Sequence, residues 1–284
     1  MLTAVAAFSL MDAGLKQLSA HYPAFQVAAI RGAASLPFVL VWALRRGGWH
    51  GLRPVRWRLH LLRGVLGVAM MASFVYALKS LPLATAYSIF FVAPLLVTAL
   101  SVPVLGEHVG PRRWTAIVVG LLGVLVLLRP SGDGFLSLAS LAVLLSAVMY
   151  AVSAVTVRML SRTDTTQSMM VWLLALLAVG AGLLALPAWQ PVRLADAMLI
   201  LGVGMAGALG QYAITEAFRQ GEASMIAPLE YTALVWGVLL DLALWHVLPD
   251  AITWLGAAII VGSGLYLLRR ERVRAVSPAV VTPP

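Results

Sequence analysis

The sequence predicts an all-α polytopic membrane protein with ten transmembrane helices, arranged as two inverted five-helix repeats. Its 284 residues are 61% hydrophobic and only 11% charged, whereas a soluble domain has roughly 25% charged residues. A chain of this size could not hide so much apolar surface from water, so we expect it to be surrounded by a lipid bilayer. Two further observations, ten long apolar runs and an internal repeat, complete the prediction.

A spanning helix needs about 20 mostly apolar residues. Met1 and Leu2 are apolar, without a basic segment or a small-residue cleavage site, so we expect the first run to be retained rather than removed as a signal peptide. Pro, Gly, Asp and Arg, which interrupt helices, occupy the short connections. The expected spans are 2–20, 24–44, 59–79, 82–104, 112–129, 135–158, 166–187, 196–218, 223–246 and 251–270.

The basic residues are distributed unevenly between the two sides of this arrangement. Alternate connections and adjoining span ends, together with Arg269 and Arg270 and the tail at 271–284, hold 14 Lys or Arg residues on one side and 3 on the other. Basic loops stay in the cytoplasm, so we expect a multi-pass protein of the bacterial inner membrane with both termini cytoplasmic. The tail is polar and is expected to be disordered. Aromatic residues are not interleaved with the basic run, so no nucleic-acid partner is expected.

An internal echo about 140 positions apart divides the chain into repeats at residues 1–130 and 134–270. Because each repeat has an odd number of spans, the second enters the membrane upside down. Inverted repeats of this kind characterise secondary transporters, whose site lies near the midplane between the halves. The echo pairs Ala77 with Ala217, Lys79 with Arg219, Trp114 with Trp254, and Leu127-Leu128-Arg129 with Leu267-Leu268-Arg269.

Charged side chains occur inside the first two apolar spans, where they are costly and usually face protein or water. Asp12 and Lys16 are four residues apart and share one helix face. Arg31 on the next span lies at a matching depth, about 10 Å from the same end. Asp12 is therefore a candidate site for a substrate amine or a proton. The alternative is a structural bridge from Asp12 to Arg31 or Lys16, which we classify as structural or coupling residues.

Prolines mark two spans for bending, because proline removes a backbone donor. Pro228 lies beside Glu230 in the ninth span, and a bend next to a carboxylate suits a gate or a coupling site. Pro94 is expected to bend the fourth span at its middle. The alternatives are a glutamate that hydrogen-bonds the loosened backbone and a proline kink that serves packing only.

Tyrosines inside the spans are candidates for lining a substrate cavity, because each has an apolar ring and one polar tip. Gln211 would add a neutral donor and acceptor for a carboxylate or an amide. The alternative for the tyrosines is anchoring at the membrane interface. The candidates are Tyr76, Tyr87, Tyr150, Tyr212 and Tyr231.

Signatures of enzymes and of cofactor sites are missing or misplaced. Gly202, Gly204 and Gly207 satisfy the string G-x-G-x-x-G, but they lie inside an apolar span rather than after a strand. We therefore expect them to allow close helix packing. Cysteine is absent, and no H-E-x-x-H, Walker or nucleophile-elbow motif occurs. We expect no cofactor, no metal site and no enzymatic activity; a membrane-embedded enzyme and a scaffold are the alternatives to a transporter.

Several motifs resemble the drug/metabolite transporter superfamily with two EamA-type halves, over about residues 1–270. They are Phe8-Ser9-Leu10-Met11-Asp12 with Lys16 and Arg31, Pro94 followed by Leu105-Gly106-Glu107, and Ala227-Pro228-Leu229-Glu230-Tyr231. The ninth span ends in Trp245-His246, where this family often has Gly-Glu. The resemblance is greatest to YddG-like exporters of aromatic and other amino acids.

The resemblance implies a ten-helix exporter of small metabolites with a cavity lined by helices 1, 3, 4, 6, 8 and 9. The expected substrate is an amino acid or a similar metabolite, moved by alternating access. An importer or exchanger of a nucleotide-like compound, a vitamin or a drug is the alternative. We expect a monomer, with a dimer as the second option.

Overall fold

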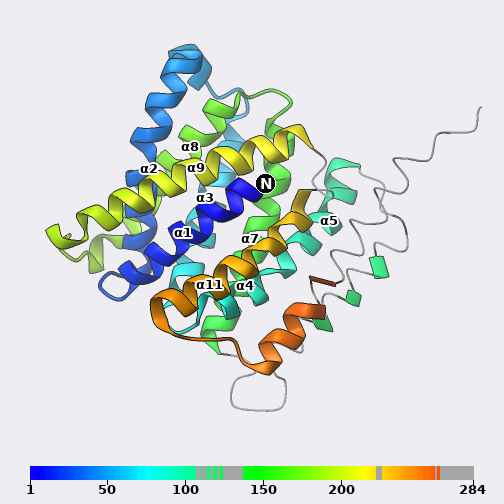
Figure 1. Cartoon of the computed structure of the whole chain (residues 1–284). Coiled ribbons are helices and arrows are strands. Elements are labelled where there is room, and N and C mark those ends of the chain that lie inside the picture. Colours follow the sequence, from blue (N-terminus) through cyan, green and yellow to red (C-terminus); the bar gives the residue numbers. More distant parts are fainter. Residues whose placement is uncertain are drawn as a thin grey trace, which may run out of the picture.

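The computed structural model describes residues 1–106, 110, 114–115, 118–119, 122–123, 137–221, 226–259 and 261–262. The secondary structure of this part is helical, without a strand (Figure 1). The α-helices are α1 (Leu2–Ser19), α2 (Ala24–Gly47), α3 (Trp57–Leu78), α4 (Leu83–Phe90), α5 (Val92–Leu105), α7 (Leu138–Leu160), α8 (Thr166–Ala185), α9 (Ala197–Gln220) and α11 (Ala233–Trp245). Short 3₁₀ helices are η1 (Trp49–Leu52), η2 (Leu186–Ala188), η3 (Leu194–Asp196) and η4 (Ala227–Thr232).

Six helical segments in this part of the chain are long and apolar enough to cross a membrane, judged by length and composition. They correspond to the second, third, fourth, sixth, seventh and eighth expected spans. Most of the fifth expected span, the end of the tenth and the tail lie outside the described residues, as do Glu107 and Arg129. The six segments are Ala24–Gly47, Trp57–Leu78, Leu83–Leu105, Leu138–Leu160, Thr166–Ala188 and Leu194–Gln220.

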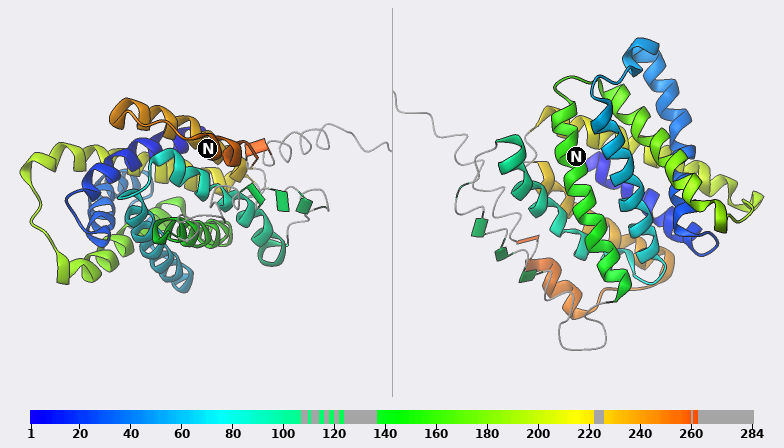
Figure 2. Two further views of the ribbon diagram at one scale, coloured as in Figure 1. Left: turned by 90° about the horizontal axis from the view of Figure 1, so that it is seen from below. Right: turned by 180° about the vertical axis from the view of Figure 1, so that it is seen from behind.

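The helices form one bundle in which segments distant in sequence pack side by side. The most extensive contacts join α2 with α8, α3 with α7, and α1 with α9. Figure 2 shows α1, α9 and α11 towards one face of the bundle and α3, α7 and α8 towards the opposite face. Each main packing pair therefore takes one helix from the first half of the chain and one from the second.

Glycines allow the closest of these helix contacts. A Cβ added at Gly32 would lie 2.7 Å from the backbone N of Ala178 on α8, and one added at Gly204 would lie 2.6 Å from the carbonyl oxygen of Ala34 on α2. Real Cβ atoms do not approach other atoms so closely, so only glycine fits at these crossings. The packing role predicted for the glycines of the eighth span is confirmed at Gly204.

The fourth expected span is interrupted at Phe91, between α4 and α5. Pro94 has no N–H for the carbonyl of Phe90, and its ring crowds that carbonyl. Phe91 accordingly has a ψ of −6°, which departs from regular α-helix geometry. The helix is therefore interrupted in the middle of this span, where a bend was predicted.

The ninth expected span is not a continuous α-helix. Its residues Ala227–Thr232 form the 3₁₀ helix η4, which contains Pro228, Glu230 and Tyr231, and α11 begins only at Ala233. Pro228 lies in the first turn, where its missing N–H costs little. A 3₁₀ segment within a longer helical span often marks a hinge. The described part of the expected span 223–246 is therefore helical but irregular, and the irregularity includes Pro228 and Glu230, where a bend was predicted.

Connections meet at both ends of the bundle. At one end, the amide of Val55 donates to Asp164 Oδ1 at 2.8 Å, and His60 Nε2 lies 2.9 Å from the same oxygen. We call these contacts the Asp164 clasp. They place the connections 48–56 and 161–165 on one side of the bundle, as the alternating topology requires.

The opposite end has a second set of contacts, which we call the Tyr22 clasp. The hydroxyl of Tyr22 donates to Asp196 Oδ2 at 2.6 Å. Gln26 and the backbone of Gln190 exchange two hydrogen bonds of 2.6 and 2.8 Å. This clasp joins the α1–α2 turn to the α8–α9 connection.

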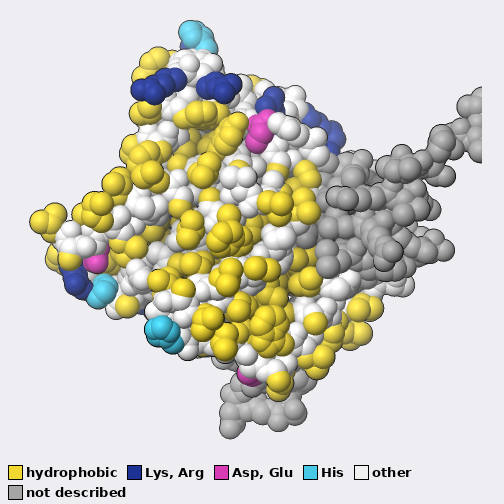
Figure 3. Space-filling view, in the orientation of Figure 1, with side chains coloured by type: hydrophobic (Ala, Val, Ile, Leu, Met, Phe, Trp, Pro, Cys, Tyr) yellow, Lys and Arg dark blue, Asp and Glu magenta, His cyan; other side chains and the backbone are white. Residues whose placement is uncertain are grey.

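Hydrophobic side chains cover the middle of the outer surface, as a lipid-facing protein requires. Figure 3 shows them across the central part of one face, whereas most Lys and Arg side chains in this view lie along its upper edge. The upper edge in this orientation is the end that carries the Asp164 clasp. Large exposed hydrophobic side chains include Leu183, Met198, Leu201 and Leu239.

Candidate functional site

A cavity of about 160 Å³ lies between the helices of the two halves. A cavity of roughly 150 Å³ can hold a molecule the size of benzene, so this one accommodates at least a single aromatic ring. Its lining includes residues of α1, α3, α4, α7, α9 and η4, which correspond to helices 1, 3, 4, 6, 8 and 9. That expected lining is confirmed, with α11 as a further part of helix 9, and α2 and α8 also contribute.

Asp12 lies at the wall of this cavity, where it is 8% exposed. It accepts a hydrogen bond of 2.9 Å from the hydroxyl of Tyr87 on α4. Neither Arg31 nor Lys16 is within ion-pair distance of Asp12. The alternative bridge to Lys16 is not formed, because Lys16 pairs with Asp241. Arg31 makes no direct ion pair with Asp12, but its charge still attracts the carboxylate from a longer distance.

Lys16 belongs to a separate contact outside the cavity lining. Its Nζ lies 3.4 Å from Asp241 Oδ1 and 4.5 Å from the centre of the Trp245 ring. Asp241 also accepts hydrogen bonds from the amides of Leu83 and Ala84 at 3.0 and 2.7 Å. These are the first residues of α4, so Asp241 on α11 caps that helix from outside.

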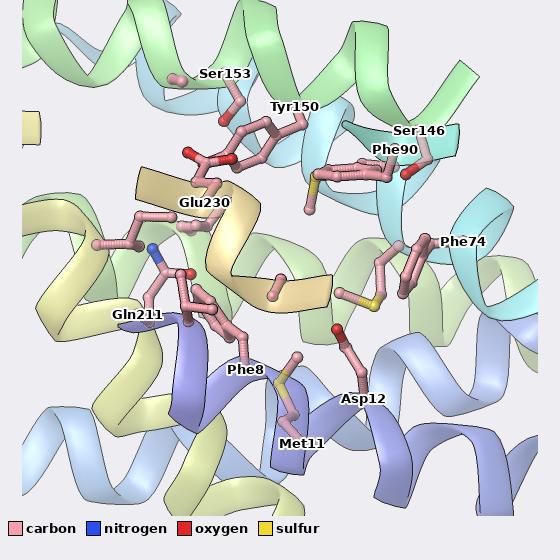
Figure 4. A pocket seen from close by; sticks show the side chains of 18 of the residues that line it. Phe8, Met11, Asp12, Phe74, Phe90, Ser146, Tyr150, Ser153, Gln211 and Glu230 are labelled. Atoms are coloured by element: carbon pink, nitrogen blue, oxygen red, sulfur yellow. The ribbon is translucent and has the colours of Figure 1, made fainter. Parts of the chain in front are cut away.

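Glu230 forms the second pair of a carboxylate with a tyrosine. Tyr150 Oη on α7 donates a hydrogen bond of 2.6 Å to Glu230 Oε1 on η4. Figure 4 shows these two side chains pointing towards one another, with Ser153 nearby and with Asp12 and Gln211 on other walls of the cavity. The cavity is thus bordered by two buried carboxylates, each held by a tyrosine from a different helix.

Two arginines also line the cavity, Arg31 on α2 and Arg63 on α3. They are 3% and 2% exposed. Arg31 Nε donates to the sulfur of Met11 at 3.2 Å, and its guanidinium lies 5.9 Å from the centre of the Phe8 ring. Arg63 Nη1 donates to the carbonyl oxygen of Met169 at 3.2 Å. Neither arginine forms an ion pair with a described residue.

The remaining polar groups of the lining are neutral. Gln211 Nε2 donates to Thr215 Oγ1 at 3.1 Å, one turn further along α9. Most of the other walls are apolar, so the cavity offers aromatic and thioether contacts to a flat molecule. The lining includes Phe8, Met11, Met70, Met71, Phe74, Phe90 and Phe91.

The structure brings together five of the nine residues predicted to bind substrate: Asp12, Tyr87, Tyr150, Gln211 and Glu230. The other four, Tyr76, Pro94, Tyr212 and Tyr231, do not line the cavity. Tyr76 is 45% exposed on the outer surface, and Tyr212 packs against the Trp42 ring at 4.9 Å. Tyr231 packs edge-on against Phe91 at 5.1 Å.

Several lining residues had no role predicted from the sequence. Arg63 carried a usable signal, because a basic residue well inside an apolar span is rare and usually functional. Ser146, Ser153, Phe74 and Phe90 carried none, since serine and phenylalanine are common in helices that pack in lipid. Among the described residues, no group of three His, Cys, Asp or Glu side chains could hold a metal ion.

A helical bundle that surrounds a central cavity with buried charges is the architecture of a membrane carrier. The chain belongs to the EamA-like transporter family, whose model matches residues 1–129 and 137–269. It is a multi-pass membrane transporter of the drug/metabolite transporter superfamily, as the sequence motifs predicted.

Curated relatives match almost the whole chain. A riboflavin transporter of Vibrio cholerae is 33% identical over 275 residues, which cover 95% of this chain and 92% of that protein. A pseudopaline exporter of Pseudomonas aeruginosa is 30% identical over 270 residues and covers 93% of both chains. An S-adenosylmethionine uptake transporter of Rickettsia bellii is 28% identical over 272 residues, covering 93% of this chain and 89% of that protein.

A solved crystal structure shares the fold. It superposes with a TM-score of 0.69 at 21% sequence identity, over 97% of this chain and 99% of the other. The relatives named above are transporters of small metabolites, which agrees with the expected absence of enzymatic activity.

Proposed function

We propose that this protein is a secondary transporter that moves a small metabolite with an aromatic or planar group by alternating access. The observation that carries the proposal is the central cavity with its two tyrosine–carboxylate pairs, Tyr87 with Asp12 and Tyr150 with Glu230. Each pair joins two different helical elements, so the rocking of these elements changes the environment of the carboxylate. A carrier needs such a link, because its substrate must bind with different affinity in the two conformations if transport is to follow.

The two states are proposed to arise from inverted repeats at residues 1–130 and 134–270. Helix pairing supports this arrangement. If α1, α2 and α3 correspond to α7, α8 and α9, then the contact of α1 with α9 corresponds to that of α7 with α3. The contact of α2 with α9 likewise corresponds to that of α8 with α3, and α2 with α8 corresponds to itself. The Asp164 and Tyr22 clasps also become equivalent, one at each end.

The two tyrosine–carboxylate pairs also occupy corresponding helices of the two repeats, but the tyrosine and the carboxylate have changed places. In the first repeat the carboxylate is on the first helix, as Asp12, and the tyrosine on the fourth, as Tyr87. In the second repeat the first helix has Tyr150 and the fourth has Glu230. We propose that these four residues and Gln211 contact the substrate or a coupled proton, while Pro94 and Pro228 permit the bending.

The first candidate substrate is an aromatic amino acid, exported across the bacterial inner membrane with both termini in the cytoplasm. Its ring suits the walls formed by Phe74, Phe90 and Tyr150, and its amine suits the buried carboxylates. A second candidate is a vitamin with a fused ring system, because a relative named a riboflavin transporter is 33% identical to this chain. Both candidates are flat molecules with polar edges.

Transport in proteoliposomes tests the proposal. The purified protein should move labelled tryptophan, phenylalanine or riboflavin down a gradient, and the substrate that competes best defines the class. Repeating the assay with and without a pH gradient shows whether protons are coupled. A failure to move any member of a panel of amino acids, vitamins and nucleotide-like compounds would overturn the transport proposal.

A further inference from the structure

Arg63 is a buried cation without an anionic partner among the described residues. Its side chain is 2% exposed, and its Nη1 donates only to a neutral acceptor, the carbonyl oxygen of Met169. Its Nε is fully buried and has no hydrogen-bond partner. Burying an unpaired charge is expensive, so the native partner of this guanidinium is not supplied by the part of the chain that the structure describes.

The position of Arg63 indicates where that partner comes from. Arg63 lines the central cavity, and its Nη2 is neither sealed in the protein nor hydrogen-bonded. It lies six residues after the start of α3 at Trp57, which is about 9 Å along the helix axis. The cavity therefore presents a cation close to the end of the bundle that carries the Asp164 clasp.

Several arginines surround that end of the bundle. The connection between α2 and α3 carries Arg53 and Arg56, and Arg58 lies in the exposed first turn of α3. A positive rim attracts anions to the mouth of a cavity and raises their local concentration. Two described acids at this end are already engaged. Asp164 accepts from the amide of Val55 and lies 2.9 Å from His60, and Glu216 accepts hydrogen bonds from Thr166, Arg219 and Gln220.

The other buried arginine of the cavity differs from Arg63. Arg31 is in contact with the Met11 sulfur through Nε and with the face of the Phe8 ring. Aromatic faces stabilise a guanidinium through cation–π attraction. Arg63 has no described ring or sulfur contact of this kind, so it depends more strongly on an external anion.

We propose that Arg63 binds an anionic group of the transported molecule, a carboxylate or a phosphate, within the central cavity. The planar guanidinium can bind either group through two parallel hydrogen bonds. This inference rests on the proposed function and adds to it the charge class of the substrate. A substrate of this kind combines a flat ring, held by the aromatic walls, with an acidic group at the Arg63 end.

Two matched pairs of compounds test the role of Arg63 on the full chain in detergent and in proteoliposomes. Tryptophan and tryptophanamide differ in the carboxylate, whereas riboflavin phosphate and riboflavin differ in the phosphate. The wild type should bind the acidic member of at least one pair more tightly, and the pair that responds identifies the group. Arg63→Gln should weaken binding of that acid about 10- to 100-fold and weaken binding of its neutral partner much less.

Two control variants make the comparison specific. Arg58→Gln removes the same charge from the exposed first turn of the same helix and should preserve the preference for the acid. Arg63→Lys keeps the charge but not the planar fork, so it should retain the preference with weaker binding. It also serves as the folded variant if Arg63→Gln cannot be purified.

The results separate this inference from the proposed function. Equal binding of acid and neutral partner by the wild type, or an unchanged preference in Arg63→Gln, would overturn the role of Arg63. Transport of the neutral compounds would still support the carrier function in that case. No transport of any compound in the broad panel would overturn the carrier function itself.

Discussion

Tyr150 donates a hydrogen bond of 2.6 Å to Glu230 and thereby joins α7 to the 3₁₀ helix η4. A similar bond of 2.9 Å joins Tyr87 on α4 to Asp12 on α1. Each pair joins two helices of the same half of the chain. In the first half, Asp12 on α1 meets Tyr87 on the interrupted helix α4–α5, and in the second half Tyr150 on α7 meets Glu230 on the interrupted helix η4–α11. The two broken elements, α4–α5 and η4–α11, therefore each hold one side of the cavity through a tyrosine–carboxylate contact.

The Tyr150 contact gives the first prediction. Tyr150→Phe removes the hydroxyl and leaves Glu230 without this donor, which should lower the free energy of unfolding by about 1–3 kcal/mol. Transport in proteoliposomes should fall at least tenfold, because the position of η4 is no longer fixed relative to α7. Tyr76→Phe is the matched control, since Tyr76 is on the outer surface. Equal transport by both variants would contradict the role of Tyr150.

Asp12 provides the second prediction. Asp12→Asn keeps an oxygen that accepts from Tyr87 but removes the negative charge. If the carboxylate acts on a substrate amine or a proton, transport is lost while the melting temperature in detergent stays within a few degrees of the wild type. Glu216→Gln is the matched control, because Glu216 lies outside the cavity lining, where it pairs with Arg219 at 3.3 Å. Active transport by Asp12→Asn would show that only the hydrogen bond matters.

The third prediction concerns Asp241, which is 1% exposed. Asp241→Ala leaves the amides of Leu83 and Ala84 uncapped and removes the partner of Lys16. The expected loss in the free energy of unfolding is about 2–4 kcal/mol, measured as a lower melting temperature in detergent. Lys16→Met should cost less, since Asp241 would still be bonded to two amides. A larger loss in Lys16→Met than in Asp241→Ala would contradict the capping role.

The glycine crossings give the fourth prediction. Gly204→Ala places a methyl group 2.6 Å from the carbonyl oxygen of Ala34, so α2 and α9 must separate, at a cost of about 1–3 kcal/mol. Gly202→Ala adds the same methyl group with nothing within 4 Å. The second change should leave stability unchanged or raise it slightly, because alanine favours helix more than glycine does. Equal melting temperatures for the two variants would disprove the close crossing.

The fifth prediction is a pH dependence of the Asp164 clasp. Burial alone would raise the pKa of Asp164, but hydrogen bonds from His60, Thr163 and the Val55 amide outweigh it and lower that pKa. A carboxylate with a lowered pKa stabilises the folded state above its unfolded pKa of about 3.9. This contribution is lost as the pH falls through the lower folded value.

Melting curves between pH 7 and pH 3 test the clasp. Asp164→Asn should melt below the wild type at neutral pH, and the difference should shrink below about pH 4 as the wild-type carboxylate takes up a proton. A difference that stays constant down to pH 3 would show that Asp164 acts through its shape rather than its charge.

The sequence by itself determined that the chain is an all-helical membrane protein of the EamA-like family, and it marked Pro94 and Pro228 as positions where a helix is disturbed. Composition requires lipid around the chain, because water cannot solvate so much apolar surface. The break near Pro94 follows from a missing backbone donor, which is a property of the residue itself. The choice of Asp12 and Glu230 as candidates also needed only their position inside apolar spans, where a carboxylate is expensive.

Only the tertiary structure decided which side chains meet. In the structure Asp12 accepts a hydrogen bond from Tyr87 and makes no ion pair with Arg31, whereas Lys16 pairs with Asp241. The structure also turned Tyr76 to the outer surface while directing Tyr150 to the cavity. The physical reason is that lipid and protein interior are both apolar, so the hydrophobic pattern of a spanning helix does not reveal which face points inward. That choice depends on helix crossings, and these depend on contacts between residues far apart in the sequence, such as Asp12 with Tyr87 at a separation of 75 positions and Lys16 with Asp241 at 225.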